Sequence, residues 1–283
     1  MKYVDIIEFM YSLDYRWDTT DFESIFSKAI RELRGLTQLD SDRKAQAYLN
    51  RGWKLFIEKH EQEVKANQYP TFNILDYTTK SIQPYYKTIK KDDLKIIKIK
   101  KKIEKRHILL KYISEELTNR EYEALGCYLC YICDSSKVFL TNSSDEHGID
   151  FVAIIPAYSK LHIFPNSNKQ LKIVGQCKKW GSPAKRDHVD LLRRSIQKIQ
   201  DTSIHIKKFI PNWFFQEKGN IIGVLVSNSG AQSGAIQSSI DYGYTIANSK
   251  DIAQAIVLSS PLELTSGEII ENMMTYINKI LEK

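Results

Sequence analysis

The sequence predicts an α/β (α+β) protein in which a small mixed sheet is flanked by helices and follows a mostly helical N-terminal region. Up to about residue 80, apolar residues recur at helical spacing. From residue 118 onward, helical segments alternate with short apolar runs that are typical of buried strands. The run at 221–227, IIGVLVS, is almost continuously apolar, as expected of a central strand covered on both faces.

Two helices are expected in the N-terminal region. Thr20 and Glu23 have capping-box spacing at the start of the first helix. Its apolar positions then repeat every three or four residues: Phe22, Phe26, Ile30 and Leu33. The second helix is expected from about residue 42 to 66 with these residues inward: Ala45, Leu49, Trp53, Phe56 and Val64. Prolines and turn residues at 67–86 predict irregular structure or short strands.

A strongly basic segment follows. Residues 87–106 contain ten basic and three acidic residues, which accounts for the whole net charge of +7 and leaves 31 groups of each sign elsewhere. This distribution argues against a uniformly basic histone-like or ribosomal protein. A concentrated positive segment attracts a polyanion: nucleic acid, a membrane surface or an acidic protein. The segment ends in a predicted helix, which is compatible both with a solvated linker and with a phosphate-contacting surface.

The second half of the chain should alternate helices and strands. Thr118 and Glu121 form another capping box, and the helix that follows through about Cys133 is apolar nearly all round, which predicts burial. Strands are expected at 137–141, 148–156, 171–178 and 221–227, and helices at 186–200, 232–240, 249–257 and 266–281. We therefore expect a mostly helical domain at 1–117, with a basic linker at 87–106, and an α/β domain at 118–283.

The composition favours a folded cytoplasmic protein. The N-terminus lacks a signal-peptide pattern, and no run approaches the roughly 18 apolar residues of a membrane helix. Cys127, Cys130 and Cys133 have a spacing that invites an iron–sulfur or zinc site, but only Cys177 remains as a fourth ligand. Cysteines buried in a packed helix are the simpler interpretation.

Polar residues interrupt the middle strands where chemistry is possible. Asp150 lies near the start of an otherwise apolar strand, where a carboxylate is costly unless it is paired or binds a cation. Gln176 and Lys178 are two residues apart and so share one face of the next strand. If the strands are neighbours, the three groups converge and suit a divalent metal, a polarised water and a scissile phosphate. Glu123, on the buried helix, is a further candidate carboxylate.

These residues resemble a known signature. An Asp followed by Gln-x-Lys resembles the PD-(D/E)XK nuclease motif, in the Mrr-like restriction endonuclease branch where Gln replaces the usual acid. The resemblance covers residues 118–257, with REYEALGCYLCYI, DEHGIDFVAI, IVGQCKKW and HVDLLRRSIQ in the expected order. It places Glu123 on the helix's acidic position and Asp145 on a less critical Asp. The chain departs from the pattern in the long spacer between Asp150 and Gln176, where the segment KLHIFPNSNK is expected to form an inserted hairpin over the site.

The resemblance implies a restriction-endonuclease-like fold and Mg²⁺-dependent (or Mn²⁺-dependent) hydrolysis of DNA phosphodiester bonds. Asp150 and Gln176 would hold the metal, and Lys178 would orient water and offset phosphate charge. Glu123 would ligate the metal or orient the lysine. The N-terminal domain would supply sequence or modification specificity. Double-strand cleavage needs two active sites, so a homodimer or larger homo-oligomer is expected.

Several alternatives stay open. Asp150 and Lys178 could form a buried ion pair, and Glu123 could pair elsewhere. A nuclease fold that binds DNA without cutting it, or a junction resolvase, would also use such a domain. Cationic residues that could contact DNA phosphates are Lys179, Lys185, Arg186, Lys98, Lys101 and Lys102.

Overall fold

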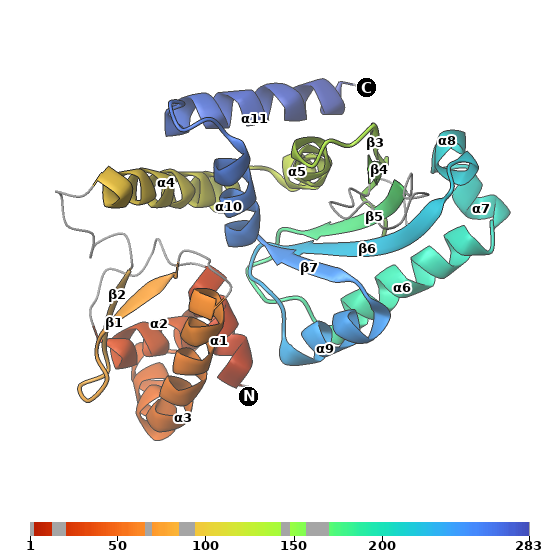
Figure 1. Ribbon diagram of the computed structural model, residues 1–283. Coiled ribbons are helices and arrows are strands. Elements are labelled where there is room, and N and C mark those ends of the chain that lie inside the picture. Colours follow the sequence, from red (N-terminus) through yellow and green to blue (C-terminus); the bar gives the residue numbers. More distant parts are fainter. Residues whose placement is uncertain are drawn as a thin grey trace, which may run out of the picture.

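The computed structural model describes residues 3–12, 21–65, 70–84, 94–142, 148–156 and 170–282. The N-terminal lobe packs helices against a short hairpin (Figure 1). Its elements are α1 (Tyr3–Ser12), α2 (Phe22–Arg34), α3 (Gln38–Lys65), β1 (Phe72–Asp76) and β2 (Ser81–Pro84). The strands at 72–84 form the predicted short-strand structure, as an antiparallel pair.

Aromatic packing holds the N-terminal lobe together. The ring of Phe22 lies 5.1–5.3 Å from the rings of Phe26, Trp53 and Phe56. These residues are buried, which confirms the predicted helical core. Two details differ from the prediction. Asp21 rather than Thr20, which lies outside the described residues, caps α2, because its carboxylate accepts the Ser24 N–H at 2.8 Å. Val64 is half exposed near the end of α3.

The C-terminal part is a mixed α/β domain. Strands in the described residues form a sheet in the order β3-β4-β5-β6-β7, antiparallel from β3 to β5 and parallel from β5 to β7. The strands are β3 (Lys137–Leu140), β4 (Phe151–Pro156), β5 (Gln170–Lys178), β6 (Gly219–Ser227) and β7 (Thr245–Asn248). The helices are α5 (Asn119–Ile132), α6 (Arg186–Gln200), α7 (Ile204–Lys207), α8 (Asn212–Gln216), α9 (Ser233–Tyr242), α10 (Ser249–Ser259) and α11 (Ser266–Leu281). The predicted mixed sheet is confirmed; α7 and α8, which are too short to carry a helical period, were not predicted.

Helices cover both faces of this sheet (Figure 1). Along β4, Phe151 and Ala153 belong to the core beneath α5, whereas Val152 and Ile154 belong to the core beneath α6. This alternation follows from the two-residue period of a strand. It explains why the strand is apolar on both faces.

Helix α4 (Leu94–Lys111) and the π-turn at Tyr112–Glu116 pack with the C-terminal core. Leu109, Leu110, Ile113 and Leu117 share one apolar cluster with α5, α10 and α11. By packing, the helical end of the basic segment therefore belongs to the sheet domain, and the domain boundary at 117 stays a prediction. Residues 87–93 lie outside the described residues. No described helix has the length and apolarity needed to cross a membrane.

Helix α5 lies close to the sheet around one aromatic ring. Phe151 is fully buried between α5 and β5. A Cβ atom on Gly126 of α5 or on Gly175 of β5 would come closer to this ring than van der Waals contact allows. Both positions therefore need glycine for the helix to approach the strand.

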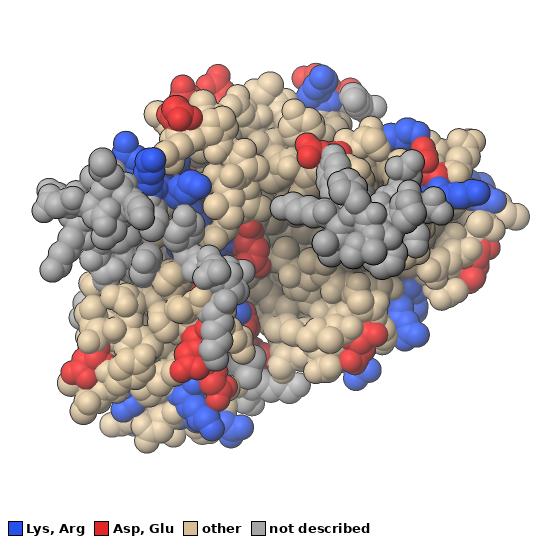
Figure 2. Space-filling model, in the orientation of Figure 1, with Lys and Arg blue, Asp and Glu red and all other residues tan. Residues whose placement is uncertain are grey.

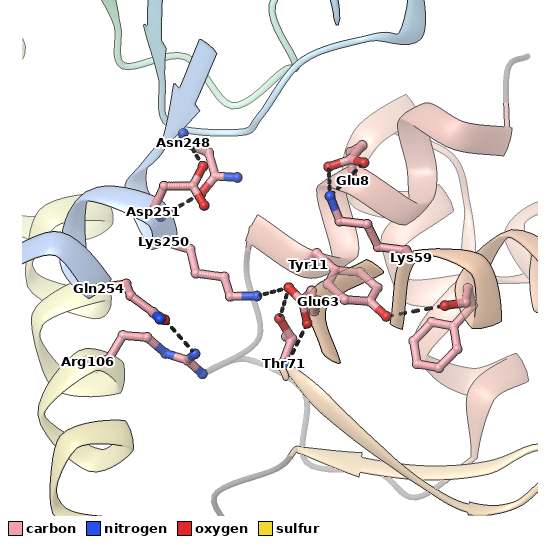
Figure 3. Close-up of polar contacts among 11 residues, drawn as sticks. Glu8, Tyr11, Lys59, Glu63, Thr71, Arg106, Asn248, Lys250, Asp251 and Gln254 are labelled. Atoms are coloured by element: carbon pink, nitrogen blue, oxygen red, sulfur yellow. Dashed lines mark hydrogen bonds and ion pairs between the residues drawn. The ribbon is translucent and has the colours of Figure 1, made fainter. Parts of the chain in front are cut away.

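The two lobes meet through buried polar groups (Figure 3). Lys250 of α10 reaches Glu63 of α3 at 2.7 Å, and both side chains are less than a tenth exposed. Glu63 also accepts hydrogen bonds from the Thr71 N–H and hydroxyl at 2.7 and 3.0 Å. Burial alone would raise the pKa of Glu63, but the Lys250 charge and these hydrogen bonds outweigh it and lower the pKa. Nearby, the Asp5 carboxylate accepts the Ser233 N–H at the start of α9 (3.1 Å).

We predict that Lys250→Ala destabilises the protein strongly. The substitution leaves the Glu63 carboxylate buried without its cation, which costs about 3–5 kcal/mol. Lys137→Ala is the matched control, because it breaks a more exposed pair with Glu217 (2.8 Å) and should cost less than about 1 kcal/mol. Urea unfolding measures both losses, and similar losses would contradict the importance of burial at this interface.

We also predict that Gly175→Ala destabilises the fold by about 1–3 kcal/mol, because the added methyl group overpacks Phe151. Gly181→Ala should be close to neutral, since a Cβ there meets nothing within 4 Å. Adding Phe151→Leu to Gly175→Ala should give a smaller loss of unfolding free energy than the sum of the single losses. Simple additivity would show that the ring and the glycine are not coupled.

Candidate active site

The register of β4 and β5 brings Asp150 beside Gln176. Phe151 pairs with Gly175, so the residue before Phe151 lies next to the residue after Gly175. The Asp150 N–H donates to the Gly175 carbonyl at 2.8 Å, and its carboxylate Oδ2 accepts the Cys177 N–H at 2.5 Å. The carboxylate is thus fixed at the edge of the sheet where β5 and β6 end.

The environment of Asp150 disfavours its ionised form. Burial is the main cause and raises its pKa from 3.8 to about 6. The Glu123 charge raises the pKa further, whereas the Cys177 N–H, Lys178 and Arg120 lower it. Two carboxylates that repel each other in a partly dry site form an arrangement that a divalent cation would stabilise.

Gln176 has an unusual environment. Its side chain is fully buried, and neither amide atom has a hydrogen-bond partner among the residues that the structure describes. Gly148, at φ +65°, allows the close approach of the amide, because a Cβ there would lie 2.6 Å from Nε2. A buried amide without partners costs about 1–3 kcal/mol or more. Such a group is free to bind a polar species that the described residues do not supply.

Glu123 is held by a residue that the sequence interpretation missed. On α5, Arg120 donates through Nη1 to Glu123 Oε2 at 2.7 Å and through Nη2 to the Thr141 carbonyl at 2.6 Å. Thr141 in turn bonds the strand at Asp150, through its N–H to the Asp150 carbonyl at 2.9 Å. The three-residue spacing of Arg120 and Glu123 on a predicted helix could have indicated this ion pair from the sequence.

Lys178 lies at the end of β5 beside an indole. Its Nζ is 5.0 Å from the centroid of the Trp180 ring, which meets the His188 ring edge-on at 4.8 Å. Burial lowers the pKa of His188, and the charge of Lys178 lowers it further. The same charge also lowers the pKa of Asp150. Trp180 and His188 were not predicted as site residues.

The turn after β6 supports this edge. The Ser229 hydroxyl donates to the Trp180 carbonyl at 2.8 Å, and the Ala184 N–H donates to the Gly230 carbonyl at 2.8 Å. In Figure 1 the ends of β5 and β6 point toward the N-terminal lobe, and Figure 2 shows a hollow between the lobes with acidic side chains near its centre.

The donor set fits a hard divalent cation. Carboxylate oxygens of Asp150 and Glu123 and the amide oxygen of Gln176 are the ligand types that Mg²⁺ and Mn²⁺ prefer. Within the described residues, no three His, Cys, Asp or Glu side chains form a group that could hold a metal ion. Asp145 and the spacer at 157–169 lie outside the described residues.

The predicted DNA-contacting residues fall into different environments. The Lys179 ammonium donates to the Leu117 carbonyl. Its hydrogen bond therefore serves the structure of the domain rather than a contact with DNA. Lys185 and Arg186 are exposed at the start of α6, near Trp180 and His188. Lys98 and Lys101 are exposed on α4, and Lys102 is half-buried.

The four cysteines lie in different environments. Cys127 and Cys130 are buried in α5, as predicted, and Cys177 is buried on β5, whereas Cys133 is exposed. Burial raises the pKa of Cys127 to about 12 and that of Cys177 well above its usual value. These thiols therefore stay protonated and behave as apolar side chains.

No family model matches the chain, and no curated protein sequence matches it. Among solved structures, the chain is similar to the MspJI restriction endonuclease in complex with a 27-mer oligonucleotide, with a TM-score of 0.39 and 16% identity. The match covers 63% of this chain and 36% of that one, and a likeness this distant does not bear on activity.

We predict a pH-dependent stability difference between the metal-free protein and Asp150→Asn. Because the folded-state pKa of Asp150 is raised to about 6, the folded protein binds more protons than the unfolded chain between about pH 4 and 6. Its free energy of unfolding therefore falls as pH rises through this interval, and Asp150→Asn removes that fall. The free energy of unfolding of Asp150→Asn, measured relative to the wild type, should therefore rise by up to about 3 kcal/mol between pH 4 and 7.

Urea unfolding in a chelator at several pH values measures this difference. Asp241→Asn, at an exposed position on α9, is the control and should show a nearly constant offset. A constant offset for Asp150→Asn as well would contradict the raised pKa.

Proposed function

We propose that the protein is a Mg²⁺-dependent DNA endonuclease of restriction type, related to the Mrr-like PD-(D/E)XK nucleases. The observation that carries the proposal is the juxtaposition of Asp150 and Gln176 at one end of the sheet, with Lys178 two residues further along the same strand. Among the described residues, the Gln176 amide has no hydrogen-bond partner. A buried amide without partners beside a carboxylate with a raised pKa is typical of a functional site.

Each residue has a chemical role in this proposal. Asp150, Gln176 and Glu123 would hold Mg²⁺ or Mn²⁺, which supplies Lewis-acid activation of the phosphate and lowers the pKa of a bound water. Lys178 would orient the attacking water and offset the negative charge that develops on the phosphate. Arg120 positions Glu123, and the Trp180 ring lies beside the Lys178 ammonium group.

The partner in this proposal is double-stranded DNA. Two copies of the chain would be needed to cut both strands, so we propose a homodimer or larger homo-oligomer that acts in the cytoplasm. The N-terminal lobe would supply sequence or modification specificity. The exposed lysines of α4 would contact backbone phosphates without reading bases.

A plasmid-cleavage assay tests the function. Wild-type protein with Mg²⁺ should nick or linearise supercoiled DNA, and a chelator should stop the reaction. Asp150→Ala and Lys178→Ala should each lower the cleavage rate by at least about 10²–10³-fold, because each removes a group that stabilises the transition state. Lys279→Ala, an exposed lysine on α11, should cleave like the wild type.

Other outcomes separate the alternatives. Equal nicking by all four proteins would exclude this site as the source of activity. Binding without cleavage by the wild type would favour a DNA-binding protein on a nuclease fold. A strong preference for branched over linear DNA would favour a junction resolvase.

A further inference from the structure

An arginine-lined groove lies on the outer side of α6, away from the metal-binding residues proposed above. It is an open hollow of about 530 Å³ near the end of α9. Its lining residues are Arg186, Asp190, Arg193, Arg194, Gln197 and Tyr242. The three arginines are exposed, so their guanidinium groups can reach a ligand from solvent.

The groove has a fixed aromatic wall. The Tyr242 hydroxyl donates to Asp190 Oδ1 at 3.1 Å, which ties the end of α9 to α6. The Arg193 guanidinium carbon lies 4.3 Å from the centroid of the Tyr242 ring. Stacking of this kind orients a guanidinium and leaves its N–H edge available for bidentate contact with an anion.

The charge of the groove favours an anionic ligand. Among its lining residues, Asp190 is the acidic one, and its second oxygen lies 3.5 Å from Arg186 Nε. Three guanidinium groups therefore face one carboxylate that is already used by Arg186 and Tyr242. Planar guanidinium groups match phosphate oxygens in geometry as well as in charge.

The N-terminal end of α6, where the groove begins at Arg186, adjoins the candidate active site. Lys178, Trp180 and His188 form a chain of contacts with spacings of 5.0 and 4.8 Å, and His188 is in the first turn of α6. From Arg186 to Arg193 the helix advances about 10 Å. One strand of B-DNA carries a phosphate per about 3.4 Å of helix axis, so the arginines span about three phosphates.

We propose that this groove binds the backbone phosphates that flank the scissile phosphate on the strand held at Lys178. The ligand is a nucleic-acid backbone, and the contacts carry no base specificity. The position of the scissile phosphate rests on the proposed function, but binding to the groove can be measured without cleavage.

The test is the salt dependence of DNA binding by the full chain. Fluorescence anisotropy with a labelled 20-base-pair duplex, in a chelator, gives Kd between about 50 and 200 mM salt. Arg193→Gln/Arg194→Gln should weaken binding at least tenfold at the lower salt concentrations. It should also reduce the slope of log K against log salt by about 2, since each lost phosphate contact contributes about 0.9.

Lys207→Gln/Lys208→Gln is the matched control. It removes the same charge from adjacent exposed residues beyond the far end of α6 and should change the slope by a few tenths at most. Thermal melting checks that both double variants fold like the wild type. The single variant Arg194→Gln should reduce the slope by about 1, because it removes one of the two phosphate contacts.

The groove proposal fails if the arginine variant binds like the wild type, if the control loses as much affinity, or if the wild type does not bind the duplex. Its failure is distinguishable from that of the proposed function. Cleavage by the wild type with unchanged binding by the arginine variant rejects the groove alone. Loss of affinity in the arginine variant, with no cleavage by the wild type, rejects the nuclease function alone.

Discussion

The geometry of the candidate site depends on the burial of one aromatic ring. Phe151 lies between Gly126 and Gly175, positions where any side chain would overlap it. Each candidate polar residue is close in sequence to a member of this contact: Glu123 one turn before the helical glycine, Asp150 before the ring, and Gln176 after the strand glycine. The packing of Phe151 of β4 against α5 and β5 thus determines where Glu123, Asp150 and Gln176 lie.

The same end of the sheet contains two polar groups whose burial costs folding free energy. The neighbouring strand positions are filled by apolar residues that pack on both faces. At the edge, by contrast, the protein buries the Gln176 amide without a partner from the described chain and holds Asp150 where ionisation is unfavourable. Local losses of this kind are expected where function rather than stability determines the residue. The apolar layers on each side provide the stability that makes them tolerable.

Local periodicity predicted most of the elements, and strand alternation predicted that Asp150, Gln176 and Lys178 lie near one another. The capping box at Thr118 predicted the start of α5, and the apolar run at 221–227 predicted β6. Both are local signals. The sequence could not show contacts between distant elements, because no periodicity records which surfaces meet. Three contacts therefore became visible only in the structure. They are the approach of Lys178 to the Trp180 ring, the hydrogen bond from Lys179 to the Leu117 carbonyl, and the packing of α4 against α10.

The polar interface between the lobes has a consequence for the order of folding during synthesis. Glu63 and Asp5 are translated long before their partners, Lys250 and Ser233, which are 187 and 228 residues further along. Domains near the N-terminus generally fold first as a chain is made. Because Glu63 and Asp5 are carboxylates, water can hydrogen-bond to both of them until their partners are made. At these two positions, the N-terminal lobe therefore exposes no apolar surface that could aggregate while the rest of the chain is synthesised.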